Sequence, residues 1–298
     1  MNGLLRGNAL LALAAAAVWG GGDFSGGMGV KAAGGSVRAA LRVVMLSHVT
    51  SFAVLVAIAR VRGDVFPHGA LLAWALAAGV AAGLSLTCFY IALSRGAMGA
   101  SAAVSGLLAA AIPAALTMVL EGSPGMRPLL GFAVAGLAIW LIAAGPASAA
   151  AGDRGRETAV LATIAGVGFG CYFVALKMAG PAGLVWPMAT TRIGSLIVCS
   201  LMFLGLRLSE GKSEADSKFR LNRRAVGWAL ATALLDTSGN LLFLAATRAG
   251  RLDVASVLAS LYPASTILLA ALALGEWPSR RQAIGMATAV IAVVLIAM

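Results

Sequence analysis

Charged residues are scarce in this sequence. They make up 11% of its 298 positions, whereas 60% of the positions are hydrophobic and the mean hydropathy is +0.94. A typical soluble domain is about one quarter charged, so an ordinary soluble domain is excluded. Because a membrane-spanning helix uses about 20 apolar residues, a set of such helices would fill most of the chain and leave only short loops. The sequence therefore predicts an integral membrane protein, with the lipid bilayer as a partner.

Cysteine and enzyme motifs are also scarce. Cys88, Cys171 and Cys199 each lie in an apolar segment, which favours small buried residues over a disulfide framework or a metal cluster. The sequence has no HExxH, nucleophile-elbow, CxxC or P-loop pattern. It therefore lacks the motifs that metalloproteases, hydrolases, thioredoxin-like proteins and ATP-driven pumps require. We therefore expect a protein that is not an enzyme, with no catalytic residue, metal site or cofactor.

The charge that is present is mostly basic. Lysine and arginine number 22 against 11 acidic residues, which gives a formal net charge of +11. In a membrane protein this excess is typical of loops that face anionic lipid. Nucleic-acid binding is therefore not expected.

Ten apolar runs are separated by glycine, proline and charged residues. Their apolar character is continuous and does not alternate with period two, which indicates helices and excludes the strands of a β-barrel. The run after Arg6 resembles a signal peptide, but it continues to Val30 without a clear cleavage site and is counted as a span. The predicted spans are 8–30, 37–59, 69–92, 99–120, 128–146, 158–178, 184–206, 225–247, 254–274 and 282–298.

The two halves of the chain share markers in the same order, 150 to 155 residues apart. These pairs are Arg42 with Arg192, Arg95 with Arg248, Glu121 with Glu276, and Gly131 with Gly285. They predict an all-α fold of ten transmembrane helices in two five-helix repeats, residues 1–150 and 151–298, within one membrane domain. An odd number of spans per repeat inverts the second half, the architecture of carriers with a site near the membrane midplane. Chance similarity between two alanine-rich and leucine-rich halves is the alternative.

Short motifs along the whole chain resemble those of the drug/metabolite transporter superfamily, in its ten-helix EamA-type branch. The motifs are Trp19-Gly20, Ala40-Leu41-Arg42, Ala92-Leu93, Tyr262-Pro263, and Gly275-Glu276-Trp277-Pro278 with Gln282 and Gly285. The first half departs from the family pattern, since Pro113 lies eight residues before Glu121 whereas Pro263 lies thirteen before Glu276. The pattern therefore supports a helix hinge at Pro263 better than one at Pro113.

The resemblance implies a fold and a broad function. Family members are secondary carriers that export amino acids, drugs or other small metabolites, or that exchange nucleotide sugars and sugar phosphates. Their cavity is lined by the first four helices of each half, and the fifth helices lie at the periphery. The resemblance also implies a multi-pass protein of the cell membrane, in bacteria the inner membrane.

Ionisable and polar groups at membrane depth are the first candidates for a site, because burying them in lipid is costly. Asp23 lies among glycines that would permit local unwinding of its helix and suits a substrate ammonium or a proton. Asp236 and Asn240 are one helical turn apart and share a face. A structural ion pair or hydrogen-bonded pair is the alternative for these residues.

Basic and aromatic side chains complete the predicted site. Arg42 and Arg192 could bind a carboxylate or phosphate, and His48 is either a proton carrier or a satisfied structural residue. Aromatic rings could receive a cation. The predicted substrate-binding residues are Trp19, Asp23, Arg42, His48, Tyr90, Tyr172, Arg192, Asp236, Asn240 and Tyr262.

This mixture of charges predicts a small zwitterionic or cationic substrate. Carboxylates suit an ammonium and arginines suit a carboxylate, so amino-acid export by alternating access is the preferred interpretation, with proton coupling as an added possibility. A multidrug or cation carrier, or a sugar-phosphate or nucleotide-sugar carrier, is the alternative within the same fold. A lipid scramblase, a channel or an intramembrane enzyme is the alternative of another class.

Orientation can be tested directly. The positive-inside rule places the basic loop 207–224 in the cytoplasm. The family resemblance instead implies cytoplasmic termini, and both termini lie on the side of the membrane opposite to this loop. With cytoplasmic termini, alkaline phosphatase fused at the C-terminus should be inactive and a fusion after residue 207 should be active. The reverse pattern would support the orientation given by the basic loop.

Overall fold

The computed structural model describes residues 2–95, 98–143, 153–210, 221–275 and 277–297. Their regular structure is helical. The elements are α1 Asn2–Ala32, α2 Val37–Arg62, α3 Gly69–Ser94, α4 Met98–Glu121, α5 Met126–Ala143, α6 Asp153–Ala179, the 3₁₀ turn η2 Gly180–Ala182, α7 Val185–Glu210, α8 Arg223–Ala249, α9 Leu252–Ala259, α10 Tyr262–Leu274 and α11 Arg280–Ala297. Glu276, the boundary between the predicted repeats and most of the loop 207–224 lie outside the described residues.

The predicted helical membrane fold is confirmed. Within the described residues, eight helical segments are long and apolar enough to cross a membrane, and α5 is a shorter apolar helix. One predicted span, 254–274, differs because it is divided into α9 and α10 at Ser260 and Leu261. Pro263 stands in the first turn of α10, where its missing N–H costs no hydrogen bond. Pro113, in contrast, lies inside the continuous helix α4.

Helix ends follow local chemistry. The Ser36 hydroxyl accepts a hydrogen bond from the Ala39 backbone N–H at 3.1 Å, and the Asn222 side chain accepts one from Ala225 at 2.7 Å. Gly63 and Gly275 end α2 and α10 with φ values of 68° and 70°, a left-handed conformation that favours glycine. The sequence thus sets where these helices begin and end.

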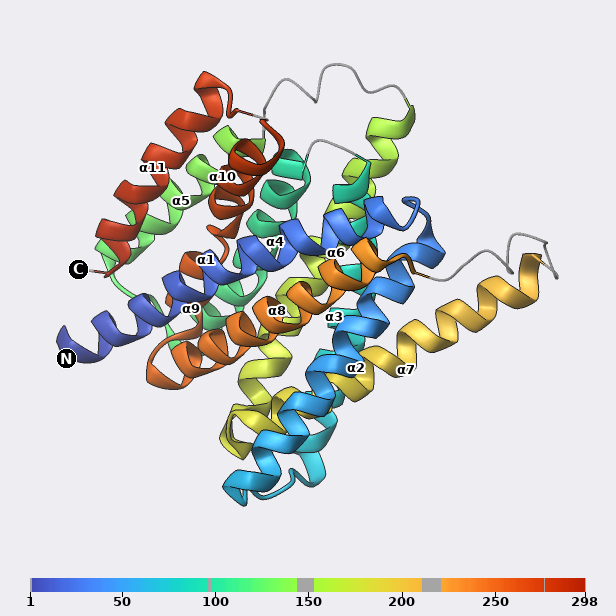
Figure 1. The fold of residues 1–298 in the computed structure, drawn as a ribbon. Coiled ribbons are helices and arrows are strands. Elements are labelled where there is room, and N and C mark those ends of the chain that lie inside the picture. The colour runs from blue at the N-terminus through green and yellow to red at the C-terminus, as the bar shows by residue number, and fades with distance from the viewer. Residues whose placement is uncertain (1, 96–97, 144–152, 211–220, 276, 298) are drawn as a thin grey trace.

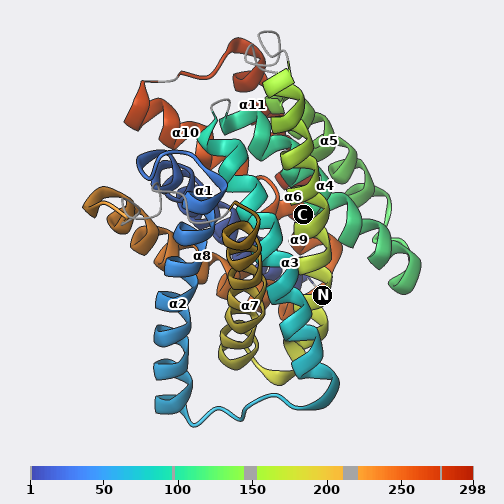
Figure 2. The ribbon, with the colours of Figure 1, turned by 90° about the vertical axis from the view of Figure 1, so that its right-hand side faces the viewer.

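Helices of the two halves pack in matched pairs. Figure 1 shows α1 beside α8 through the middle of the molecule, and the equivalent helices α6 and α3 also contact each other. Likewise α1 packs on α10 as α6 packs on α4, and α2 packs on α8 as α7 packs on α3. Figure 2 shows α2, α7 and α3 running side by side. Exchanging the halves leaves this pattern unchanged, which supports the predicted repeat.

Equivalent helices run in opposite directions. At one end of the α2–α7 pair the Arg38 side chain donates to the Leu206 carbonyl at 3.4 Å, and at the other end Trp186 donates to the Asp64 carbonyl at 2.7 Å. Residues near the start of each helix therefore meet residues near the end of the other. An inverted-topology repeat requires this antiparallel arrangement of equivalent helices.

The peripheral pair α5 and α11 shows the same relation at its glycines. A Cβ on Gly131 would lie 2.5 Å from the Ile296 side chain, and a Cβ on Gly285 would lie 2.9 Å from the Ile142 side chain. Each contact is the repeat equivalent of the other. Small residues allow the two backbones to approach closely, which is how helices associate in lipid.

Replacing Gly285 by alanine should destabilise the folded protein. The new Cβ would lie 2.9 Å from the Ala138 carbonyl oxygen and 3.0 Å from the Ile142 backbone nitrogen, so helix backbones must separate. We expect a loss of about 1–3 kcal/mol, seen as a lower melting temperature in detergent. Gly205→Ala is the control, because open space surrounds that position within α7. Equal melting temperatures for the two variants would contradict close packing of α5 on α11.

Candidate functional site

A cavity lies between helices of the two halves. The space open to the centre of a water molecule is about 40 Å³, enough for about three waters at roughly 10–15 Å³ each. Helices α1, α3 and α4 of the first half and α6, α7, α8 and α10 of the second line it. The lining residues are Trp19, Asp23, Ala82, Leu86, Ala109, Phe169, Tyr172, Phe173, Arg192, Asp236, Asn240 and Tyr262.

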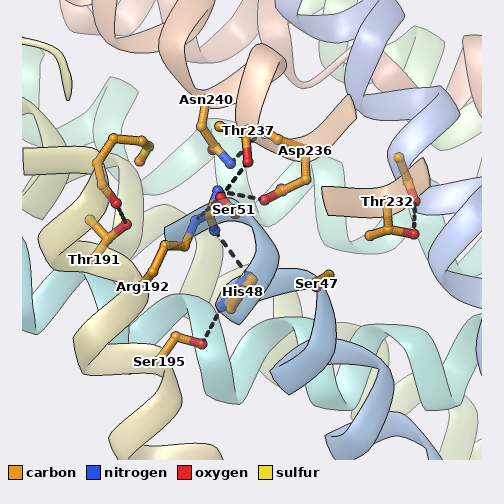
Figure 3. Close-up of polar contacts among 12 residues, drawn as sticks. Ser47, His48, Ser51, Thr191, Arg192, Ser195, Thr232, Asp236, Thr237 and Asn240 are labelled. Atoms are coloured by element: carbon orange, nitrogen blue, oxygen red, sulfur yellow. Dashed lines mark hydrogen bonds and ion pairs between the residues drawn. The ribbon is translucent and has the colours of Figure 1, made fainter. Parts of the chain in front are cut away.

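A buried ion pair forms one wall of the cavity. The Arg192 Nη2 atom donates to Asp236 Oδ2 at 2.7 Å, and the two side chains are 1% and 12% exposed. Arg192 Nε also donates to Ser51 Oγ at 3.0 Å, and Nη1 lies 3.0 Å from His48 Nε2 (Figure 3). Three nitrogens of the guanidinium therefore each have a polar partner, as a charge inside the membrane requires.

Local sequence explains how these groups converge. His48 and Ser51 are three residues apart on α2 and so face the same neighbour. A Cβ on Gly83 of α3 would lie 2.7 Å from Ser195 Oγ, so glycine allows α7 to approach α3 closely. Arg192 and Ser195 are likewise three residues apart on α7.

Hydrogen bonds extend this wall along α8. The Tyr172 hydroxyl donates to Asn240 Oδ1 at 2.7 Å, and Asn240 Nδ2 donates to the Asp236 backbone carbonyl at 2.7 Å. Ser51 also hydrogen-bonds to Thr237. The predicted pair Asp236 and Asn240 thus faces the cavity and is also hydrogen-bonded within the bundle.

Asp23 differs from Asp236 in its partners. Within the described chain no hydrogen bond or ion pair is made by the Asp23 side chain, although it lines the cavity. The glycines beside it serve packing: a Cβ on Gly22 would lie 3.3 Å from the Asp236 backbone nitrogen, and Gly26 contacts the Tyr90 ring. In this structure α1 is continuous from Asn2 to Ala32, so the helix is wound at these glycines.

Aromatic rings form another wall. Trp19 stacks on Phe173 with ring centroids 5.4 Å apart and an interplanar angle of 7°, and Phe243 packs against both rings. The Tyr262 hydroxyl is hydrogen-bonded to Ser105 at 2.7 Å. The cavity thus combines aromatic surface with the Asp23 carboxylate.

The structure separates three predicted residues from the cavity lining. His48 lies behind Arg192, and Tyr90 packs against Gly26 with its hydroxyl lacking a hydrogen-bond partner in the described chain. Arg42, the repeat equivalent of Arg192, lies 5.1 Å from the centroid of the Phe203 ring. The sequence could not distinguish these residues from the lining ones, because their depth along a helix is similar and only packing decides which face meets the cavity.

Several residues of the site were missed by sequence reasoning. Phe169 and Phe173 line the cavity, and Ser51 and Ser195 hold its polar groups. Hydroxyl and phenylalanine side chains are common in apolar helices, so they do not stand out by type. Spacing could have found some of them, since Ser51 and Ser195 each lie three residues after a predicted site residue.

Comparisons with known proteins agree with this arrangement. Residues 157–298 match the model of the EamA-like transporter family, which confirms the resemblance read from the motifs. A crystal structure described only as "Crystal structure of protein" shares the fold, with a TM-score of 0.69 at 17% identity over 97% of this chain and 95% of that one. No curated protein matches the chain. The described helices are those of a multi-pass membrane protein, and the family matched by the second half of the chain is a family of transporters.

The two cavity carboxylates should respond differently to neutralisation. Asp236→Asn leaves the Arg192 charge buried without its counter-ion, which costs about 3–5 kcal/mol and should lower the yield of folded protein in detergent. Asp23→Asn removes a carboxylate with no described partner, so its melting temperature should stay close to that of the natural protein. Asp64→Asn, which breaks the exposed pair with Arg62 at 3.2 Å, is the control. A folding defect in Asp23→Asn as large as in Asp236→Asn would contradict the contrast.

Proposed function

We propose that this protein is a secondary carrier that exports a small zwitterionic or cationic metabolite, with amino acids as the substrate class, by alternating access. The observation that carries the proposal is the cavity in which the Asp23 carboxylate and the Arg192 guanidinium are both lining groups. These two groups complement the ammonium and the carboxylate of an amino acid. The proposed location is the inner membrane of a bacterium.

The charges of the site favour a substrate with an ammonium group. Arg192 and Asp236 neutralise each other, so Asp23 leaves one carboxylate without a counter-charge among the described residues. An ionised carboxylate in a low-dielectric cavity needs a cation or a proton. We propose that Asp23 binds the substrate ammonium and takes up a proton when the cavity is empty, which would couple export to proton entry.

Arg192 retains donors for the substrate carboxylate. A guanidinium has five N–H groups, and the described contacts to Ser51, His48 and Asp236 engage one at each nitrogen. The further N–H groups of Nη1 and Nη2 can donate to a carboxylate in the cavity. Trp19 and Phe173 would then contact the apolar part of the substrate.

The size of the cavity supports alternating access. The space open to the centre of a water molecule is about 40 Å³, which is room for a few waters, and we propose that the helices around it separate when a substrate enters. The lining helices come from both halves, and the equivalent helices α2 and α7 run antiparallel. Such halves can open toward one face and then the other around a shared site.

A carrier of organic cations is the second candidate. It is favoured by the stacked Trp19 and Phe173 rings near the unpaired Asp23 carboxylate, since aromatic faces attract cations. Amines that lack a carboxylate distinguish the two candidates. An amino-acid carrier should transport an amino acid better than the amine that its decarboxylation gives.

Transport can be measured by counterflow in proteoliposomes. Labelled amino acids, the matching amines, cationic drugs and sugar phosphates would each be tested with and without a proton gradient. We expect saturable counterflow of amino acids that is faster when a proton gradient is applied. Flux of sugar phosphates or lipids without amino acids, or turnover without flux, would overturn the proposal.

Substitution at the site should separate binding from folding. Asp23→Asn should lower amino-acid counterflow by about tenfold or more, the effect of losing an interaction with a charged group. Arg192→Gln should weaken amino-acid transport more than transport of the matching amine, because only the amino acid has a carboxylate. Asp64→Asn, at a residue that is not part of the cavity lining, should leave the transport of both compounds unchanged. Normal flux in Asp23→Asn and Arg192→Gln would contradict the assigned site.

A further inference from the structure

His48 is buried between two helices of opposite halves and has a polar partner at each ring nitrogen. Its side chain lies on α2, 1% exposed. Nε2 lies 3.0 Å from Arg192 Nη1, and Nδ1 lies 2.7 Å from Ser195 Oγ, both on α7 (Figure 3). It touches the cavity only through Arg192.

The chemistry of arginine decides the state of this ring. A guanidinium carries hydrogen on every nitrogen and cannot accept a hydrogen bond. Nε2 of His48 must therefore present its lone pair to Arg192 Nη1, because an N–H there would place two donors 3.0 Å apart. The ring hydrogen then lies on Nδ1 and is donated to the Ser195 hydroxyl.

Charge leads to the same state. Arg192 is the charged group that faces His48, and Asp236 lies on the other side of its guanidinium at 2.7 Å. Ser51 of the same helix and Ser195 of α7 are uncharged, and α3 approaches Ser195 with Gly83. The charges of Arg192, Asp236 and His48 add up to zero only while the histidine is neutral. A charged imidazole would place a second positive charge 3.0 Å from the Arg192 guanidinium inside the membrane, which is costly.

We propose that His48 is a positioning residue that stays neutral, with hydrogen on Nδ1. Through the hydrogen-bond chain from Ser195 to His48 to Arg192, it holds the guanidinium toward Asp236 and the cavity. His48 is then not the proton carrier, although its residue type suggests that role. This assignment adds to the proposed function, on which its transport readout rests. Its spectroscopic readout is independent of any substrate.

The chain contains only two histidines, His48 and the exposed His68, which makes the ring state measurable. In the full-length His68→Gln protein labelled with ¹⁵N-histidine, NMR should show one ring with a protonated Nδ1 and an unprotonated Nε2. This spectrum should stay the same between about pH 5 and pH 8, where a free histidine titrates. A doubly protonated ring at the acidic end, or hydrogen on Nε2, would overturn the proposal.

Removing the donor provides the causal test. In Arg192→Gln, combined with His68→Gln, the His48 signals should change with pH across that interval, because Nε2 is released from the guanidinium. Ser200→Ala on the same helix α7, whose hydroxyl is exposed and 3.8 Å from the Met45 sulfur, should leave the spectrum unchanged. If the signals stay unchanged in Arg192→Gln, the guanidinium does not set the ring state and the proposal fails.

Conservative variants test positioning in transport. The Gln amide oxygen reaches the Nε2 position and can accept from Arg192, so His48→Gln should keep the pH profile and nearly the natural KM for a transported amino acid. Asn reaches only the Nδ1 position, so His48→Asn should raise KM by about 10- to 100-fold, the effect of one lost hydrogen bond to a charged group. Loss of the pH dependence in a folded His48→Gln would identify His48 as a proton carrier and overturn the assignment. Counterflow failing in the natural protein would instead contradict the proposed function and leave the NMR result standing.

Discussion

The Arg192 charge constrains the centre of this protein more than any other group. Its side chain is 1% exposed inside a helical membrane bundle, where an unpaired guanidinium would be very costly. Asp236 balances the charge, while His48 and Ser51 satisfy other nitrogens. These partners come from α2 in the first half and α8 in the second. The polar centre therefore joins the two halves at the cavity.

Close packing makes this convergence possible. Gly83 on α3 and Gly22 on α1 let helix backbones approach α7 and α8 where any larger residue would clash or crowd them. Lipid provides little hydrophobic driving force between helices, so contact between small surfaces has to stabilise the bundle. The abundance of glycine and alanine is thus a condition for bringing polar groups from four helices within hydrogen-bond distance.

The inverted halves share a design but differ in chemistry at equivalent positions. Arg192 is buried in the polar centre, whereas its equivalent Arg42 packs over the Phe203 ring. The break ahead of Pro263 divides α9 from α10, whereas Pro113 lies within an unbroken α4. The proposed site has different groups on each side for this reason, as the proposed substrates, an amino acid or an organic cation, would require.

The sequence by itself determined the membrane fold, the span positions and the repeat, because long apolar runs and residue spacing are local properties. It also selected Asp23, Arg192 and Asp236, since charges at membrane depth are rare, and Asn240, which lies one helical turn from Asp236. Only the tertiary structure decided that Arg192 and not Arg42 reaches the centre, and that His48 lies behind the guanidinium. It also added the phenylalanine wall and the supporting serines. Those outcomes depend on helix rotation and on contacts between residues more than 100 positions apart, such as Ser51 with Arg192, which no local pattern encodes.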